Sequence, residues 1–186
     1  MSPSGAPTPV DPPAMIMGLS RPGPVTPHDH REQATVGRQL RRPPRGQFTV
    51  AHRCPCALPD VIETAPRLAD GTPFPTLYYL TCPRANSAVG TLEASGLMAA
   101  MTDRLSADDD LAGRYAAAHS DYLRRRDDLG ELATRESAGG MPTRVKCLHA
   151  LVAHSLAAGP GVNPLGDEAL KLLPPWWASG PCVEPS

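Results

Sequence analysis

The feature that most constrains the fold is one segment, residues 143–158, that is apolar on nearly every side. Pro142 suits a first helical position, and Gly159-Pro160 is typical of a helix end. A helix that is apolar all round is a buried one. We therefore expect a central core helix over 143–158, whose apolar residues at helical spacing are Val145, Leu148, Ala150, Leu151, Val152 and Leu156.

Three shorter segments have the composition of β-strands. Residues 47–54, 60–68 and 76–82 are rich in β-branched and aromatic side chains. Asp70-Gly71, between the second and the third, is typical of a hairpin turn. The economical prediction is a small antiparallel meander.

The segments that follow have the apolar spacing and capping residues typical of helices. Residues 83–105 carry an apolar pattern with a break at Ser95-Gly96. The sequence "SADD" at 106–109 resembles a capping box, with Asp109 in the acidic position. It precedes an apolar stripe at spacings of four, three and four: Leu111, Tyr115, Ala118 and Tyr122.

Two more features follow along the chain. The charged run 124–128 is expected to be a solvated helix end. Asp167 is expected to cap a last short helix. The fold class that we predict is α+β, a small antiparallel meander packed on four to five helices with one buried central helix.

The domain organisation follows from composition. Residues 1–30 are rich in proline and cannot bury enough apolar surface to offset their ordering, so they are expected to be disordered. A single α+β domain is expected over 31–173, followed by a Pro/Trp tail over 174–186.

Charge and hydropathy restrict the function classes. The formal net charge of −1 argues against a nucleic-acid binder that relies on bulk positive charge. No apolar run approaches the roughly 20 residues that span a bilayer, so no membrane span is expected. We predict a cytoplasmic location and, with it, reduced cysteines.

The cysteines suggest a metal site. Cys54 and Cys56 would point to one face if the chain stays extended, and Cys82 ends the third predicted strand. Four thiolates, or three with a histidine, make a closed tetrahedral zinc site. The predicted metal ligands are Cys54, Cys56, Cys82, Cys147 and His154, with His149 as the alternative histidine.

Two other interpretations of the cysteines stay open. Free cysteine is among the most buried residue types, so these thiols can be plain core residues. A reactive cysteine is the other interpretation, and it would need a base within hydrogen-bond reach, for which His52, His149 and His154 are candidates.

The entry to the central helix suggests a different chemistry. The Gly-rich loop over 139–146 carries Arg144 and Lys146, and free backbone amides in such a loop can hold an anion. His149 would then be the general acid or base.

Several longer motifs resemble one known family, the actinobacterial domain of unknown function family 501 (DUF501). They are "RCPC", "DGTPFPTLYYLTCP", "LEASGLM", "SAGGMPTRVKCLHALVAH" and "AAGPGVNPLGDEAL", and the resemblance runs over about residues 33–173. It implies a bacterial, cytoplasmic protein of no established activity, encoded near a septum-formation-initiator-like protein and an exopolyphosphatase. A division-related partner is implied by that neighbourhood alone.

The resemblance also bears on the ligand set. The family pattern covers Cys54, Cys147 and His149, while the positions of Cys56 and Cys82 vary and a histidine can replace Cys82. The first functional prediction is a non-enzymatic zinc-binding or interaction module, linked through the resemblance to cell division. The alternative is a small enzyme that acts on an anionic or phosphorylated substrate.

Overall fold

A computed structural model describes residues 30–184 of the chain. The predicted disordered segment lies outside this part, apart from its last residue. The described residues form six helices and three strands: α1 (His30–Leu40), β1 (Phe48–Arg53), β2 (Pro59–Thr64), β3 (Tyr78–Leu80), α2 (Pro83–Ala94), α3 (Leu97–Ala107), α4 (Asp109–Leu129), α5 (Leu148–Ala158) and α6 (Pro164–Leu172).

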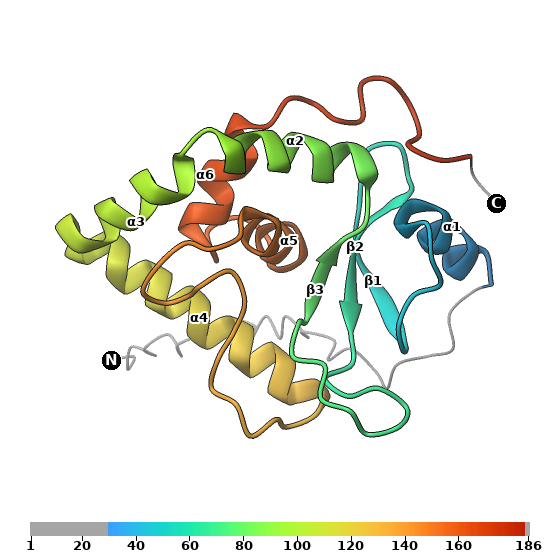
Figure 1. Ribbon diagram of the computed structural model, residues 1–186, viewed down its shortest axis with the longest axis horizontal. Helices are drawn as coiled ribbons and strands as arrows, with labels where there is room; N and C mark the ends of the chain where they lie inside the picture. Colours follow the sequence, from blue (N-terminus) through green and yellow to red (C-terminus); the bar gives the residue numbers. More distant parts are fainter. Residues whose placement is uncertain (1–29, 185–186) are drawn as a thin grey trace, which may run out of the picture.

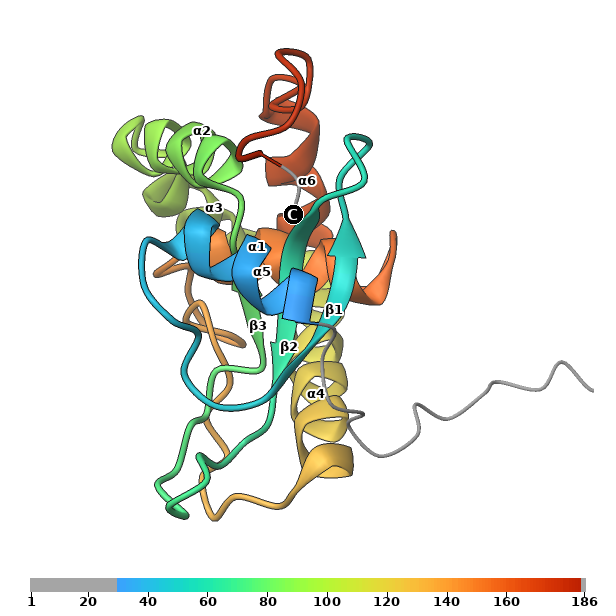
Figure 2. The same cartoon turned by 90° about the vertical axis from the view of Figure 1, so that its right-hand side faces the viewer.

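The three strands form the predicted antiparallel meander, in the order β1-β2-β3. Helix α1 covers one face of this sheet, and the other helices lie on the opposite side (Figures 1 and 2). The α+β class is therefore confirmed, with one helix more than the upper expectation. No helix in residues 30–184 is long and apolar enough to cross a membrane.

Helix α5 is the central helix of the fold. It contacts β3, α2 and α6, and Figure 1 shows it end-on in the middle of the helical layer. Leu151, Val152 and Ala153 are fully buried, which confirms that the apolar segment forms the core.

The start of α5 differs from the prediction. The helix begins at Leu148, with Cys147 as its N-cap residue, so Pro142 is not in its first turn. Residues 139–146 instead fold into turns, in which the Lys146 amide donates to the Gly139 carbonyl at 2.7 Å. Gly139 has φ +68°, and a Cβ atom there would lie 2.7 Å from the Leu151 side chain. A left-handed residue packed this tightly against α5 has to be glycine.

Two other caps also differ. Asp108, not the start of "SADD", caps α4 by accepting the Leu111 amide at 2.9 Å. Asn163 caps α6 by accepting the Gly166 amide at 3.0 Å. Asp167 lies in the first turn of α6, where its carboxylate accepts the Gly161 amide. Asp108 follows the serine that the pattern indicated, and Asn163 precedes Asp167. Each is the residue directly before its helix, where a side-chain oxygen reaches an amide of the first turn.

The apolar stripe of α4 is buried, as predicted, and includes Tyr115 and Tyr122. The charged end of this helix is not wholly solvated. Arg126 is fully buried and donates to the carbonyls of Thr134 and Glu136, both at 2.8 Å. A buried guanidinium has to be paired, and here the loop after α4 supplies the acceptors.

The C-terminal segment packs against the helical layer. Trp176 is buried in the main core cluster, and Arg84 of α2 donates to the Gly180 carbonyl at 2.6 Å. Residues 174–184, which we predicted to be a tail, therefore contact the domain.

Candidate metal centre

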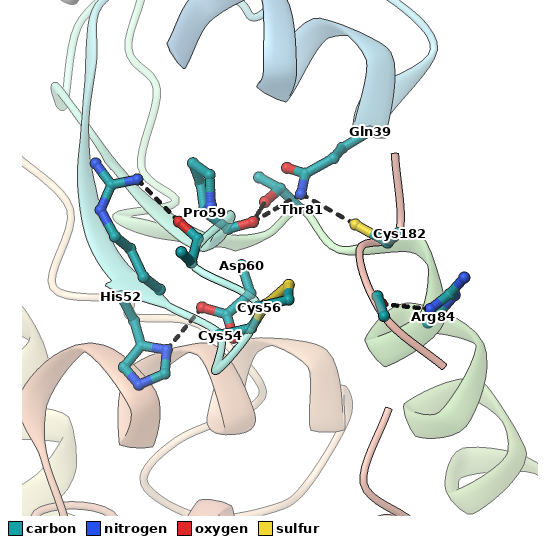
Figure 3. Close-up of a disulfide and its surroundings, with 12 residues drawn as sticks. Gln39, His52, Cys54, Cys56, Pro59, Asp60, Thr81, Arg84 and Cys182 are labelled. Atoms are coloured by element: carbon teal, nitrogen blue, oxygen red, sulfur yellow. Dashed lines mark hydrogen bonds and ion pairs between the residues drawn. A yellow bond between two sulfur atoms is a disulfide. The ribbon is translucent and has the colours of Figure 1, made fainter. Parts of the chain in front are cut away.

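The structure does not bring the five predicted zinc ligands to one point. Cys54 and Cys56 are bonded to each other as a disulfide, with their Cα atoms 5.3 Å apart (Figure 3). The chain does not stay extended here, because a turn begins at Cys54, whose carbonyl accepts the Ala57 amide at 2.8 Å. The expectation of free thiols is wrong for this pair, and neither sulfur is a thiolate ligand in this structure.

Cys82 lies at the N-terminus of α2, next to Cys182. Burial, with the neighbouring Cys182 thiol, raises the pKa of Cys82 to about 11. The thiol is therefore protonated at neutral pH, which disfavours metal binding. The sulfur of Cys182 in turn accepts a hydrogen bond from the Gln39 side chain at 3.3 Å.

His154 is a core residue. It is fully buried, and its ring stacks on Tyr78 with the ring centroids 5.9 Å apart. Its Nε2 lies 3.1 Å from the Asp121 carboxylate and its Nδ1 lies 3.3 Å from the Asn163 amide nitrogen. Both ring nitrogens are thus used in holding α5 to α4 and to the loop before α6.

The burial of His154 predicts a loss of stability in mild acid. Burial lowers the pKa of His154 below its ordinary value of 6.5, although Asp121 opposes this. As the pH falls below about 6.5, the unfolded chain takes up a proton that the folded chain refuses, so the free energy of unfolding decreases. Burial alone would raise the pKa of Asp121, but its hydrogen bonds to His154 and Arg125 lower that pKa. The stability that Asp121 contributes is therefore lost only as the pH falls below its ordinary pKa of 3.8.

The measurement is urea unfolding of the protein and of His154→Gln between about pH 7 and about pH 5. The variant is less stable at neutral pH but should lose less stability on acidification. His30→Gln, at an exposed position of α1, is the control and should follow the unchanged protein. Parallel pH curves for the protein and His154→Gln would contradict the assignment.

Two of the predicted residues, Cys147 and His149, meet a residue that the sequence did not indicate, Glu93. One donor atom from each lies within 4.8 Å of the other two. Among residues 30–184, no other group of three or more His, Cys, Asp or Glu side chains brings its donor atoms so close together. Thiolate, imidazole and carboxylate are the three ligand types that zinc takes in proteins.

The backbone fixes these three side chains from two helices. Cys147 and His149 belong to the first turn of α5 and its cap, and Glu93 lies near the end of α2. The Leu148 amide donates to the Glu93 carboxylate at 2.6 Å. Glu93 therefore satisfies an amide at the start of α5 and places its negative charge at the positive end of that helix.

The His149 ring is held at both nitrogens. Its Nδ1 lies 3.1 Å from the Glu93 carboxylate, and its Nε2 lies 3.2 Å from the carbonyl oxygen of Asn86. A proton on Nε2 is the natural donor to that carbonyl, which directs Nδ1 toward Glu93 and Cys147.

The electrostatics of the cluster favour a cation. The hydrogen bond with Cys147 and, after it, the interactions with Glu93 raise the pKa of His149 to about 9, although burial opposes this. Partial burial alone would raise the pKa of Glu93, but the hydrogen bonds from His149 and Leu148 outweigh it and lower that pKa. At neutral pH His149 thus carries a proton, and the contacts with Glu93 and Cys147 stabilise that charge.

Cys147 and His149 also line a pocket of about 380 Å³. Its other walls include Tyr78 and Tyr79 of β3 and Asn86 of α2. His149 is only partly buried, so its ring faces a cavity and not packed side chains. A larger pocket of about 660 Å³, along α1, holds none of the candidate residues.

Arg144 and Lys146 are both exposed and neither lines this pocket. Their backbone groups serve the loop, since the Arg144 amide donates to Gly140 and the Arg144 carbonyl accepts from Tyr115. The amide of Leu148, which an anion at α5 would need, is already bonded to Glu93. The predicted anion site therefore lacks its donors.

Residues 50–171, well over half of the chain, match the model of the family described as "Protein of unknown function (DUF501)". No curated protein and no solved structure matches the chain.

Proposed function

We propose that this chain, which belongs to the DUF501 family, is a metal-binding protein in which Glu93, Cys147 and His149 hold one divalent transition-metal ion, with zinc as the first candidate. The observation that carries the proposal is the convergence of three donor atoms of different chemistry within 4.8 Å of one another. This ligand set replaces the one that the cysteine spacing suggested.

The distances between the three donor atoms are close to those between the ligands of a bound zinc ion. Ligands of tetrahedral zinc at about 2.0–2.3 Å lie roughly 3.3–3.8 Å apart. The His149 Nδ1 and Glu93 oxygen are 3.1 Å apart and the other pairs are within 4.8 Å. Each separation thus differs by at most about 1 Å from the range that tetrahedral zinc requires.

The hydrogen bonds of the His149 ring also support a metal site. A metal-bound histidine usually donates its second N–H to a carbonyl or carboxylate, which fixes the ring. Asn86 supplies such a carbonyl on the Nε2 side. A thiolate and a carboxylate would neutralise a divalent ion, which would take the place of the proton on Nδ1.

The test is elemental analysis of the purified, untagged protein, before and after dialysis against a chelator and reloading with zinc. The expected result is close to one zinc per chain, with a higher melting temperature in the loaded protein because the ion binds the folded state. A metal-free preparation whose melting temperature zinc does not change would refute the proposal.

A second candidate function is an enzyme at the same site. Its supporting observation is the pocket that Cys147 and His149 line, because a three-residue zinc site keeps a fourth position for water or substrate. The anionic or phosphorylated substrate has less support, since Arg144 and Lys146 lie outside the pocket. Turnover of ester, amide or phosphate probes by the zinc-loaded protein, lost on chelation, would favour this function over a purely structural ion.

The link to cell division stays a prediction from the resemblance. Its test is co-purification of the tagged protein with division proteins from its own cells.

A further inference from the structure

A second chemically reactive group, a disulfide, lies at the end of the β1–β2 hairpin, apart from the candidate metal centre. The disulfide between Cys54 and Cys56 has two unequal sulfurs. Cys54 is buried at 4% exposure, whereas Cys56 is partly exposed. A thiolate from solution can therefore reach the sulfur of Cys56 more easily than that of Cys54.

Asp60 lies in the surroundings of this disulfide (Figure 3). It is fully buried, and its Oδ1 lies 2.6 Å from Nδ1 of His52, a partly exposed residue. Its Oδ2 is buried without a hydrogen-bond partner. A buried carboxylate oxygen without a donor is costly, so a native structure that keeps one needs a reason.

Reduction of the disulfide would supply the missing donor. Cys54 opposes Leu58 across the turn, since its amide donates to the Leu58 carbonyl at 3.0 Å. Asp60 is the extra residue of a bulge in β2, because Arg53 pairs with Pro59 and His52 with Val61. Its side chain reaches His52, two residues before Cys54, and lies beside the disulfide (Figure 3). An S–H group on Cys54 would thus be a new hydrogen-bond donor close to the buried Asp60 carboxylate, whose Oδ2 has no partner.

We propose that the Cys54–Cys56 pair is a reversible thiol–disulfide exchange site for low-molecular-weight thiols. A thiolate R–S⁻ attacks the sulfur of Cys56, so that an R–S–S–Cys56 bond forms and the Cys54–Cys56 bond breaks. Cys54 leaves with the electron pair and takes up a proton. A second thiolate attacks the mixed disulfide and releases RSSR and Cys56, which is protonated in turn. Two electrons pass from two R–SH molecules to the protein, and the reverse sequence oxidises the dithiol.

His52 and Asp60 supply the proton to Cys54. A buried thiolate beside a buried carboxylate is unfavourable, so Cys54 has to be protonated as it leaves. His52 Nδ1–H gives its proton to Oδ1 of Asp60, 2.6 Å away, while its Nε2 takes one from solvent. The Asp60 carboxyl group then turns about its Cβ–Cγ bond, which brings that proton to the Cys54 sulfur. Cys82 does not compete as a nucleophile, because its thiol stays protonated at neutral pH.

The first test uses the whole protein without substitution. It is incubated, folded, in glutathione buffers of varied redox ratio, and the thiols are then alkylated and located by peptide mass mapping. The Cys54–Cys56 pair should change between disulfide and dithiol with the ratio and return on reversal. A pair that stays oxidised in folded protein under excess dithiothreitol, or stays reduced under excess oxidised glutathione, would overturn the proposal.

The second test identifies the attacked sulfur. Cys54→Ser, treated with oxidised glutathione, should carry glutathione on Cys56 at least about tenfold faster than Cys56→Ser carries it on Cys54, because access controls the rate. Cys182→Ser is the matched control and should leave the exchange of the Cys54–Cys56 pair unchanged. Equal capture rates in the two variants would overturn the assignment of Cys56.

The third test addresses Asp60. Asp60→Asn should slow the opening of the Cys54–Cys56 disulfide by glutathione at least about tenfold, because it removes the acid that protonates Cys54. In the Cys54→Ser background the same substitution should not change the capture of glutathione on Cys56, where no Cys54 sulfur leaves. An equal effect in both backgrounds would overturn the proton-transfer role of Asp60.

Discussion

Gly166→Ala should lower the free energy of unfolding by about 3 kcal/mol, at the upper end of the range for overpacked cores. Gly166 is where α6 crosses α5. A Cβ atom there would lie 2.3 Å from the carbonyl oxygen and 2.8 Å from the carbonyl carbon of Leu151, and 2.4 Å from the Ser155 hydroxyl. Backbone atoms in a buried helix cannot move aside, so α6 has to shift away from α5. Leu165 and Ala169, both fully buried, would lose their packing.

The measurement is chemical and thermal unfolding of the variant beside Gly113→Ala. Gly113 lies in α4, is exposed, and has no atom within 4 Å of its added Cβ. Alanine there should stabilise the protein by about 0.5–1 kcal/mol, because it restricts the unfolded chain and favours the helix. Gly166→Ala with a melting temperature equal to that of the unchanged protein would show that α6 does not pack on α5 as described.

Local sequence patterns predict much of this fold. The all-round apolar composition of 148–158 requires burial wherever the segment lies, and the apolar stripe of α4 requires one buried face. The break at Ser95-Gly96 follows from the backbone preferences of those two residues, and Gly96 has φ +85° at the N-terminus of α3. These features depend on residues that are close together in the sequence.

The start of α5 depends on a distant residue. Residues 143–147 have a helical pattern, but the helix begins at Leu148. The amide of Leu148 is satisfied by Glu93, 55 residues earlier in the chain. Spacing within one segment cannot reveal such a partner. The one local signal is that Glu93 is the sole acidic residue over 83–102, and an isolated carboxylate on a helix is a candidate for a specific contact.

The same reasoning explains the change in the candidate site. Cys147 and His154 are seven residues apart, so they would lie on one face of the helix if the helix already included Cys147. Because Cys147 is the cap, His149 becomes its neighbour, and His154 is enclosed by Asp121 and Asn163 from other parts of the chain. The sequence therefore indicated Cys147 as a ligand, but its spacing favoured His154 and left His149 as the alternative histidine. The grouping of Cys147 and His149 with Glu93 depends on the packing of α2 against α5.

Cys147→Ser should weaken zinc binding at least about a hundredfold. Even residues that only orient a metal ligand change affinity by about 10- to 100-fold when removed, and Cys147 would be a ligand itself. A serine hydroxyl does not ionise at neutral pH, so the ion would lose a negative donor. Affinity is measured by competition with a chelating dye, at one fixed pH because zinc has to displace the proton held by His149.

Two control variants make this result specific to the cluster. Glu93→Gln keeps an oxygen that can accept the Leu148 amide and hold the start of α5, but it removes the charge. It should therefore weaken zinc binding and lower stability modestly, because the charge no longer faces the start of α5 and His149. Cys54→Ser should bind zinc as tightly as the unchanged protein, because Cys54 belongs to the hairpin disulfide. Loss of zinc in Cys54→Ser as well as in Cys147→Ser would instead favour the ligand set predicted from the cysteine spacing, which includes both cysteines. That result would require the hairpin to open, since its sulfurs are bonded to each other and not to a metal in this structure.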